Sequence, residues 1–160
     1  MRAIITGSFD PMTLGHVEVV KKASGFFEEI YVVALLNPEK DYMFSMEEKK
    51  EIMRLSLSNV KNIIIDTYEG LTADYMHKHK ITKIIRGIRN DEDRVYEEKL
   101  AKSMKEFDTS FDTIFIEADE QYSKISSTYA KKLIKEGKSL DGVIADAAKA
   151  YIIKAISLRK

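Results

Sequence analysis

The sequence contains no cysteine, which excludes disulfide frameworks, thiolate catalysis and cysteine-based zinc sites and suits a reducing compartment. It also lacks net charge, with 26 basic and 26 acidic residues, and this disfavours a general binder of nucleic acid or anionic membranes. No run approaches the roughly 20 apolar residues that a membrane span needs. The apolar stretch in the first six residues is too short for a signal peptide. We therefore expect a cytoplasmic protein that contacts neither membrane nor nucleic acid.

The length and composition of the chain are typical of a globular protein. It has 160 residues, of which 44% are apolar and 32% charged, enough to form a buried core. Only two prolines occur, Pro11 and Pro38, and no stretch resembles a linker, a repeat or a low-complexity segment. We predict a single domain covering residues 1–160.

Short apolar runs alternate with longer stretches of helical periodicity. Strands are expected over five runs: 3–6, 30–36, 63–65, 83–88 and 113–117. Helices are expected over six stretches: 16–27, 45–58, 71–79, 91–107, 127–136 and 142–158. The second helix opens on Ser-Met-Glu-Glu, the pattern of a capping box. This alternation predicts an α/β fold, a five-stranded parallel sheet flanked by helices.

The first candidate motif follows the first expected strand. Residues 7–11 read Gly-Ser-Phe-Asp-Pro and residues 13–16 read Thr-Leu-Gly-His. Gly7 would let the backbone approach a phosphate, and His16 would lie in the first turn of a helix, where free N–H groups favour anions. A plain strand–turn–helix junction with a surface histidine explains the motif equally well, because the Walker lysine and the Gly-x-Gly-x-x-Gly spacing are both missing.

Two further motifs follow later strands. Residues 86–89, Arg-Gly-Ile-Arg, place two arginines around a glycine, and arginine forks bind phosphate oxygens; a solvated loop is the alternative. Residues 122–128, Tyr-Ser-Lys-Ile-Ser-Ser-Thr, precede a helix, and on their own they are better explained as capping residues. Because ligands bind beyond the carboxyl ends of parallel strands, we expect all three motifs to share one site.

Other polar residues are less informative on their own. Lys40 follows the second strand, where an isolated lysine usually faces solvent. His77 and His79 are expected at the surface, and the acidic run 91–93 on a solvated helix face. No carboxylate pair or histidine cluster has metal-ligand spacing, so any Mg²⁺ is expected to arrive on the phosphates of a nucleotide.

Taken together, the motifs are more specific. A strand followed by Gly-Ser-Phe-Asp-Pro and Thr-x-Gly-His resembles the nucleotidylyltransferase superfamily with the His-x-Gly-His type of motif. With Arg-Gly-Ile-Arg, Ile-Ser-Ser-Thr and Lys40, nearly the whole chain is similar to the bacterial phosphopantetheine adenylyltransferase family. The resemblance implies a Rossmann-like dinucleotide-binding domain, usually assembled as a homo-hexamer. It also implies transfer of AMP from ATP to 4′-phosphopantetheine, giving 3′-dephospho-coenzyme A and pyrophosphate in the penultimate step of coenzyme A biosynthesis.

The same resemblance implies roles for individual residues. The catalytic residues would be His16, which contacts the ATP phosphates, together with Lys40 and Arg89. The acceptor would contact Ser8, Lys40, Thr72 and Arg86. ATP would contact a larger set drawn from all three motifs: Ser8, Phe9, His16, Gly87, Ile88, Arg89, Glu97, Tyr122, Ser123, Lys124, Ile125, Ser126, Ser127 and Thr128.

Departures from the family pattern are few, and three alternatives remain. Leu14 stands where asparagine is common, and Thr128 replaces a frequent serine but keeps the hydroxyl.

A sister enzyme acting on another phosphate acceptor, such as nicotinate mononucleotide, usually has histidine where this chain has Thr13. A fragment of a class I aminoacyl-tRNA synthetase should contain a Lys-Met-Ser-Lys-Ser loop, which is absent. A non-catalytic nucleotide sensor on the same fold can be separated only by an activity assay.

Overall fold

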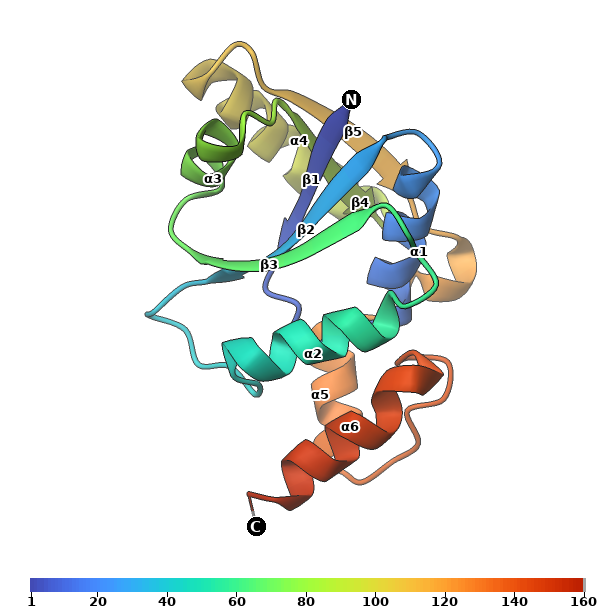
Figure 1. Cartoon of the computed structure of the whole chain (residues 1–160). Coiled ribbons are helices and arrows are strands. Elements are labelled where there is room, and N and C mark those ends of the chain that lie inside the picture. The colour runs from blue at the N-terminus through green and yellow to red at the C-terminus, as the bar shows by residue number, and fades with distance from the viewer. Residues whose placement is uncertain (160) are drawn as a thin grey trace.

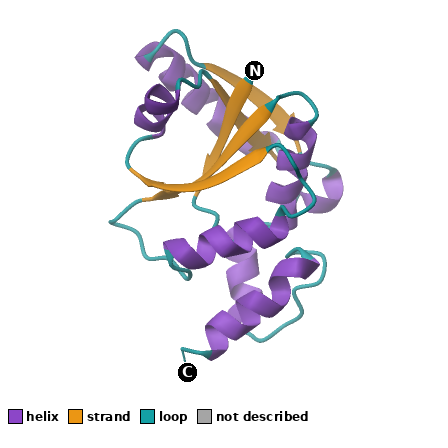
Figure 2. Ribbon diagram, in the orientation of Figure 1, coloured by secondary structure: helices purple, strands orange, loops and turns teal. Residues whose placement is uncertain are grey.

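The computed structural model describes residues 1–159 and contains one parallel sheet. Its five strands, drawn in orange in Figure 2, lie in the order β3-β2-β1-β4-β5. Their bounds are β1 Arg2–Gly7, β2 Glu29–Leu36, β3 Ile63–Glu69, β4 Lys83–Ile88 and β5 Asp112–Glu117. The central strands β1 and β2 are buried along most of their length, as expected of parallel strands covered on both faces. The predicted α/β fold is confirmed.

Residues 1–159 form six α-helices around this sheet (Figure 1). Their bounds are α1 Leu14–Ser24, α2 Met46–Ser56, α3 Thr72–His79, α4 Asp91–Phe107, α5 Ser127–Lys135 and α6 Asp146–Ser157. A single 3₁₀ turn covers Glu120–Tyr122. Helix α6 packs against α2, at the end of the molecule opposite the N-terminus. In the described residues, no helix has both the length and the apolar character that a membrane crossing requires.

Two cores form because alternate residues of β1 point to opposite faces of the sheet. Ala3 and Ile5 face the larger core, which also buries side chains of α1, α2, α5 and α6. Ile4 faces the smaller core, with Tyr75 and Met76 of α3, and α4 covers part of the same face. Helices α1 and α4, which follow neighbouring strands, therefore lie on opposite faces of the sheet.

Several boundaries differ from those expected. Helix α1 starts at Leu14 and ends at Ser24, before the turn at Gly25. Strand β3 continues to Glu69 although its second half is polar, because residues 66–69 still pair with β2 at the edge of the sheet. Helix α6 begins only at Asp146, after Gly142 has taken the left-handed conformation with φ of 76°. The capping box of α2 is confirmed by two reciprocal hydrogen bonds between Ser45 and Glu48.

The two histidines of α3 differ from one another. His77 is exposed as expected, and its Nε2 lies 2.7 Å from the carboxylate of Asp108. His79 is half-buried and stacks on Tyr75, with ring centroids 4.1 Å apart. The prediction of a surface position was therefore wrong for His79, because its flat ring covers the aromatic side of the smaller core.

Candidate active site

The site lies where β1 and β4 end. These strands are neighbours in the sheet, and the helices that follow them lie on opposite faces, so the chain leaves a crevice between them. Such a switch point, at the carboxyl edge of a parallel sheet, is where open α/β proteins bind their ligands. The first motif, after β1, and the second motif, which forms the end of β4, meet there, as the sequence predicted.

Two cavities open at this edge. The first, which we call the histidine cavity, has about 320 Å³ and is lined by residues of all three motifs, including Phe9, His16, Gly87, Arg89 and Ser127. The second, the lysine cavity, has about 900 Å³ and is lined by Ser8, Lys40 and Thr72 among others. Thr6, Gly7 and Arg86 line both cavities. The two cavities therefore adjoin along β1 and β4.

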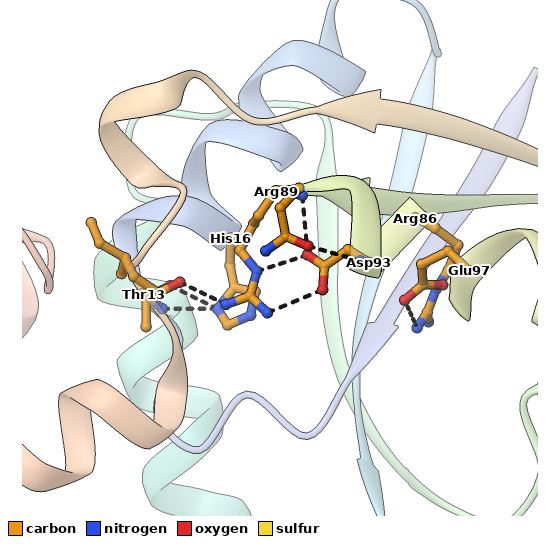
Figure 3. Close-up of polar contacts among 8 residues, drawn as sticks. Thr13, His16, Arg86, Arg89, Asp93 and Glu97 are labelled. Carbon is orange, nitrogen blue, oxygen red and sulfur yellow. Dashed lines mark hydrogen bonds and ion pairs between the residues drawn. The ribbon is translucent and has the colours of Figure 1, made fainter. Parts of the chain in front are cut away.

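His16 lies in the first turn of α1 with a fixed tautomer. The backbone N–H of Thr13 donates to its Nδ1 at 2.9 Å, and the Thr13 hydroxyl lies 3.2 Å from the same nitrogen (Figure 3). Since a backbone amide can only donate, Nδ1 must accept, and the ring proton belongs to Nε2. Burial, reinforced by the positive charge of Arg89, lowers the pKa of His16 to about 4. At neutral pH the side chain is thus an uncharged hydrogen-bond donor.

Lowering the pH is expected to decrease the stability of the folded protein, because His16 is buried in its neutral form. The unfolded chain would protonate this histidine near its ordinary pKa of 6.5, whereas the folded chain would do so only near pH 4. The unfolded state binds more protons between these values, so the free energy of unfolding should fall as the pH drops from 6.5 to 4, by up to about 3 kcal/mol. Urea titrations of wild type and His16→Gln across this range measure the effect.

The matching control is spectroscopic. Nitrogen NMR of the ring should show the proton on Nε2 at pH 7 and no titration of His16 above pH 5. A ring that titrates between pH 6 and 7 would contradict the stability effect, and a proton on Nδ1 at pH 7 would contradict the assignment of the tautomer.

Arg89 is held by an acidic partner that the sequence analysis placed in solvent. Its guanidinium forms an ion pair with Asp93 at 2.9 Å, and its backbone N–H donates to the same carboxylate at 3.1 Å (Figure 3). A third bond runs from Nη1 to the carbonyl of Ile125 at 3.0 Å, which ties the second motif to the third. The expectation of a solvated acidic run was therefore wrong for Asp93, which lines the histidine cavity.

Arg86 lies between the two cavities and is paired with Glu97. Nε donates to one carboxylate oxygen at 2.6 Å and Nη2 to the other at 3.0 Å, the bidentate geometry that arginine favours (Figure 3). Nη1 lies 3.3 Å from the hydroxyl of Thr6. The Glu97 side chain is only 12% exposed. Glu97, expected to contact ATP, thus orients Arg86 here.

Close packing shapes the floor of the histidine cavity. A Cβ on Gly87 would lie 2.9 Å from Cγ2 of Val19, so only glycine fits between β4 and α1 at this point. Phe9 takes a left-handed conformation with φ of 45°, which a bulky residue rarely adopts. Its ring is buried and meets His16 edge to face at 5.1 Å. The strained turn thus places an aromatic wall beside the histidine.

The third motif joins the site at the start of α5. The hydroxyl of Ser127 donates to the carbonyl of Pro11 at 2.9 Å, and Ser126 caps the helix by accepting from the N–H of Tyr129. Both serines and Ile125 line the histidine cavity. The capping explanation is therefore confirmed for Ser126, while the same turn also borders the cavity.

The lysine cavity has a different character. Ser8, Lys40 and Thr72 come from the segments that follow β1, β2 and β3, and all three line this cavity. Its lining also includes the largely apolar side chains of Tyr96, Leu100, Ala101 and Met104 of α4. This combination suits a ligand with an anionic end and a long, weakly polar arm.

Not every predicted residue lines a cavity. Ile88, Tyr122, Ser123, Lys124 and Thr128 are absent from both linings, although the Cβ of Tyr122 lies only 3.8 Å from the position of a Cβ on Gly15. Thr6, Thr13 and Asp93 line the histidine cavity, although no site role was predicted for them from the sequence. The spacing of Arg89 and Asp93, four residues apart at a helix start, was the available signal. Within residues 1–159, no group of three acidic or histidine side chains could hold a metal ion.

Comparison with known proteins agrees with this fold. The chain matches the Cytidylyltransferase-like family over residues 4–133 and belongs to it, so the protein is a nucleotidyltransferase. Two relatives, each called phosphopantetheine adenylyltransferase, are 34% identical over 99% of both chains (Shouchella clausii) and 36% identical over 96% of both chains (Thermotoga neapolitana). The chain belongs to the phosphopantetheine adenylyltransferase family.

A solved structure supports the fold independently. Nicotinic acid mononucleotide adenylyltransferase of Plasmodium falciparum, complexed with NaAD, superposes with a TM-score of 0.67, covering 96% of this chain and 95% of that one. The two share only 22% sequence identity, so the similarity concerns the fold alone.

Proposed function

We infer that the protein transfers AMP from ATP to 4′-phosphopantetheine, giving 3′-dephospho-coenzyme A and pyrophosphate. The observation that carries this inference is the pair of adjoining cavities with Arg86 between them. The histidine cavity offers donors suited to a triphosphate, and the lysine cavity offers a cation for a phosphate together with apolar side chains for an arm. Family membership points to the same reaction.

The chemistry would be an in-line displacement. A phosphate oxygen of the acceptor attacks the α-phosphorus of ATP, the new P–O bond forms as the bond to the β-phosphate breaks, and pyrophosphate leaves with the electron pair. The attacking phosphate is already anionic at neutral pH, since its second pKa is about 6, so no general base is required. ATP would enter as its Mg²⁺ complex, the metal being part of the substrate.

The protein's contribution would then be positioning and charge stabilisation. Nε2–H of His16 and the guanidinium of Arg89 would bind the oxygens of ATP, on which negative charge accumulates. Ser8 would contact both substrates, and Lys40 and Arg86 would hold the acceptor phosphate. Thr72 would contact the arm, and the backbone around Gly87 and the turn at 125–127 would hold the nucleotide.

The direct test is an assay of pyrophosphate release with two acceptors. We expect turnover with 4′-phosphopantetheine and little with nicotinate mononucleotide, the acceptor suggested by the Plasmodium falciparum enzyme's name. Formation of dephospho-coenzyme A, followed by mass spectrometry, identifies the product. Preference for nicotinate mononucleotide would overturn the proposal in favour of the sister activity.

Lys40→Ala is expected to weaken binding of the acceptor selectively. Lys40 lines the lysine cavity, so loss of its ammonium group should raise KM for phosphopantetheine by about 10-fold to 100-fold, the range for a hydrogen bond to a charged group. KM for ATP should change little. Lys50→Ala, which removes an exposed lysine of α2, is the matched control. An unchanged KM for phosphopantetheine would remove Lys40 from the acceptor site.

We also propose that the chain forms a homo-hexamer in the cytoplasm. Helix α4 supports assembly, because none of its 17 described residues is buried. Val95 and Phe107 on this helix are 56% and 64% exposed, and neighbouring side chains wall the lysine cavity. Contiguous exposed apolar surface marks an interface. Light scattering after size-exclusion chromatography should give six copies, and a monomer would refute the assembly.

A further inference from the structure

Lys49 of α2 occupies an unusual position. Its side chain is fully buried, which is rare for lysine, and Nζ has no hydrogen-bond partner among residues 1–159. The charge of Asp10 acts on Lys49, but the oxygens of Asp10 accept the backbone N–H groups of Met43 and Phe44 at 2.9 Å each. Burial lowers the pKa of Lys49, and the charge of Lys131 lowers it further against the opposing effect of Asp10. Neither the acceptor nor ATP is expected to reach this group.

The ammonium group instead faces an aromatic ring. Nζ of Lys49 lies 3.4 Å from the centroid of the Tyr42 ring, the geometry of a cation–π interaction. Such an interaction is strongest where water is excluded, as it is at a fully buried amine. Tyr42 is half-buried and borders the lysine cavity. The buried charge therefore fixes the plane of a ring beside the proposed acceptor site.

The hydroxyl of Tyr42 extends this connection to the turn that contains Lys40. It accepts the backbone N–H of Asn37 at 2.9 Å. The carbonyl of Asn37 accepts the N–H of Lys40 at 3.0 Å, and its side chain accepts the N–H of Glu39 at 3.0 Å. A continuous set of contacts thus runs from Lys49 through Tyr42 and Asn37 to Lys40.

The turn has little other support. Residues 37–41 are all exposed, and the chain is anchored again only at Met43 and Phe44, on the carboxylate of Asp10. An exposed turn with few buried contacts opens easily unless a specific contact holds it. We propose that Tyr42 and Lys49 are positioning residues that fix the turn at 37–41 and so place Lys40 in the lysine cavity. This inference rests on the proposed function of Lys40.

Four variants separate the two contacts. Tyr42→Phe removes only the hydroxyl bond to Asn37 and keeps the ring on Lys49. Lys49→Met keeps the volume but removes the charge under the ring, whereas Lys49→Arg keeps a cation that stacks on aromatic faces. Tyr129→Phe, at an exposed tyrosine of α5, is the matched control.

The expected result is weaker binding of the acceptor with nearly unchanged binding of ATP. Tyr42→Phe and Lys49→Met should each raise KM for phosphopantetheine about 3-fold to 10-fold, while KM for ATP stays within about 2-fold. Lys49→Arg should recover most of the loss, and Tyr129→Phe should match wild type. In a Lys40→Ala background the same two substitutions should have no further effect, because both would act through Lys40. Equal loss for both substrates, or additive effects in that background, would overturn the inference.

Hydrogen exchange tests the turn without relying on activity. The amide of Asn37 should exchange faster in Tyr42→Phe and Lys49→Met than in wild type, and in Tyr129→Phe it should not. Unchanged exchange would overturn the inference even if the proposed function holds. The proposed function can fail separately. If the wild-type protein were inactive with phosphopantetheine while the Asn37 amide still exchanged faster in both variants, the proposed function would be overturned, but Tyr42 and Lys49 would still be shown to hold the turn.

Discussion

His16→Ala is expected to lower turnover by at least about 10²–10³-fold while leaving the fold intact, the usual cost of removing one donor to charge that develops in a transition state. The physical reason is the fixed tautomer. Thr13 occupies Nδ1, so Nε2–H is directed by the protein before any ligand arrives, and burial keeps the ring uncharged. A donor held in place needs no rearrangement as negative charge gathers on the α-phosphate and the leaving pyrophosphate.

The measurement should separate chemistry from binding. Single-turnover rates at saturating ATP report the chemical step, and a thermal melt at pH 7.5 reports the fold. His16→Gln can present an N–H near the position of Nε2 and should recover part of the rate, whereas His16→Asn, whose amide mimics Nδ1, should not. His77→Ala, at an exposed histidine on α3, is the control. Near-normal turnover of His16→Ala would remove His16 from the reaction.

Arg86→Met should damage both activity and stability. Arg86 borders both cavities, so kcat/KM should fall by about 10²–10³-fold. The substitution also leaves Glu97, whose side chain is only 12% exposed, without its bidentate partner. Stranding a largely buried carboxylate should lower the free energy of unfolding by about 2–3 kcal/mol. Steady-state kinetics and urea denaturation measure the two effects.

Two further variants separate these effects. Arg86→Met combined with Glu97→Gln should regain most of the lost stability and none of the activity, because it removes the stranded charge without restoring the cation. Arg94→Met, on the same helix as Glu97, breaks a surface pair with Glu117 of β5 and should cost less than about 1 kcal/mol. If Arg86→Met kept full kcat/KM, Arg86 would be a purely structural partner of Glu97.

Local sequence signals predicted the regular elements well where apolar pattern and caps agreed. Strand β4 and helix α4 have the expected bounds, because the isoleucine pair Ile84 and Ile85 lies just before Arg86 and Gly87, and Asn90 caps the following helix. Strand β3 was predicted too short, since Asp66 and Thr67 look polar in sequence. In the fold Asp66 accepts from the hydroxyl of Tyr75 at 2.8 Å, a contact that no local pattern could show.

The site was harder to predict than the fold, for a similar reason. Strand order brings Ser8, His16, Arg86 and Arg89 to one edge, and the rule for parallel sheets anticipated this. Which charges neutralise one another depends on rotamers and burial instead. Glu97 and Asp93 therefore emerged as partners of the two arginines only in the structure. Lys49, one charge in a helix of mixed charges, carried no sequence signal that it would be buried.

The bond from the Ser127 hydroxyl to the Pro11 carbonyl has a consequence for biosynthesis. It joins residues 116 positions apart, and β1 must also pair with β4, so the nucleotide crevice closes only after most of the chain has left the ribosome. A ribosome adds about 5–20 residues per second, so β1 and β2 are made several seconds before the segments that complete the crevice. ATP stabilises only a state that can bind it. The nascent protein must therefore fold up to this point without help from its own substrate.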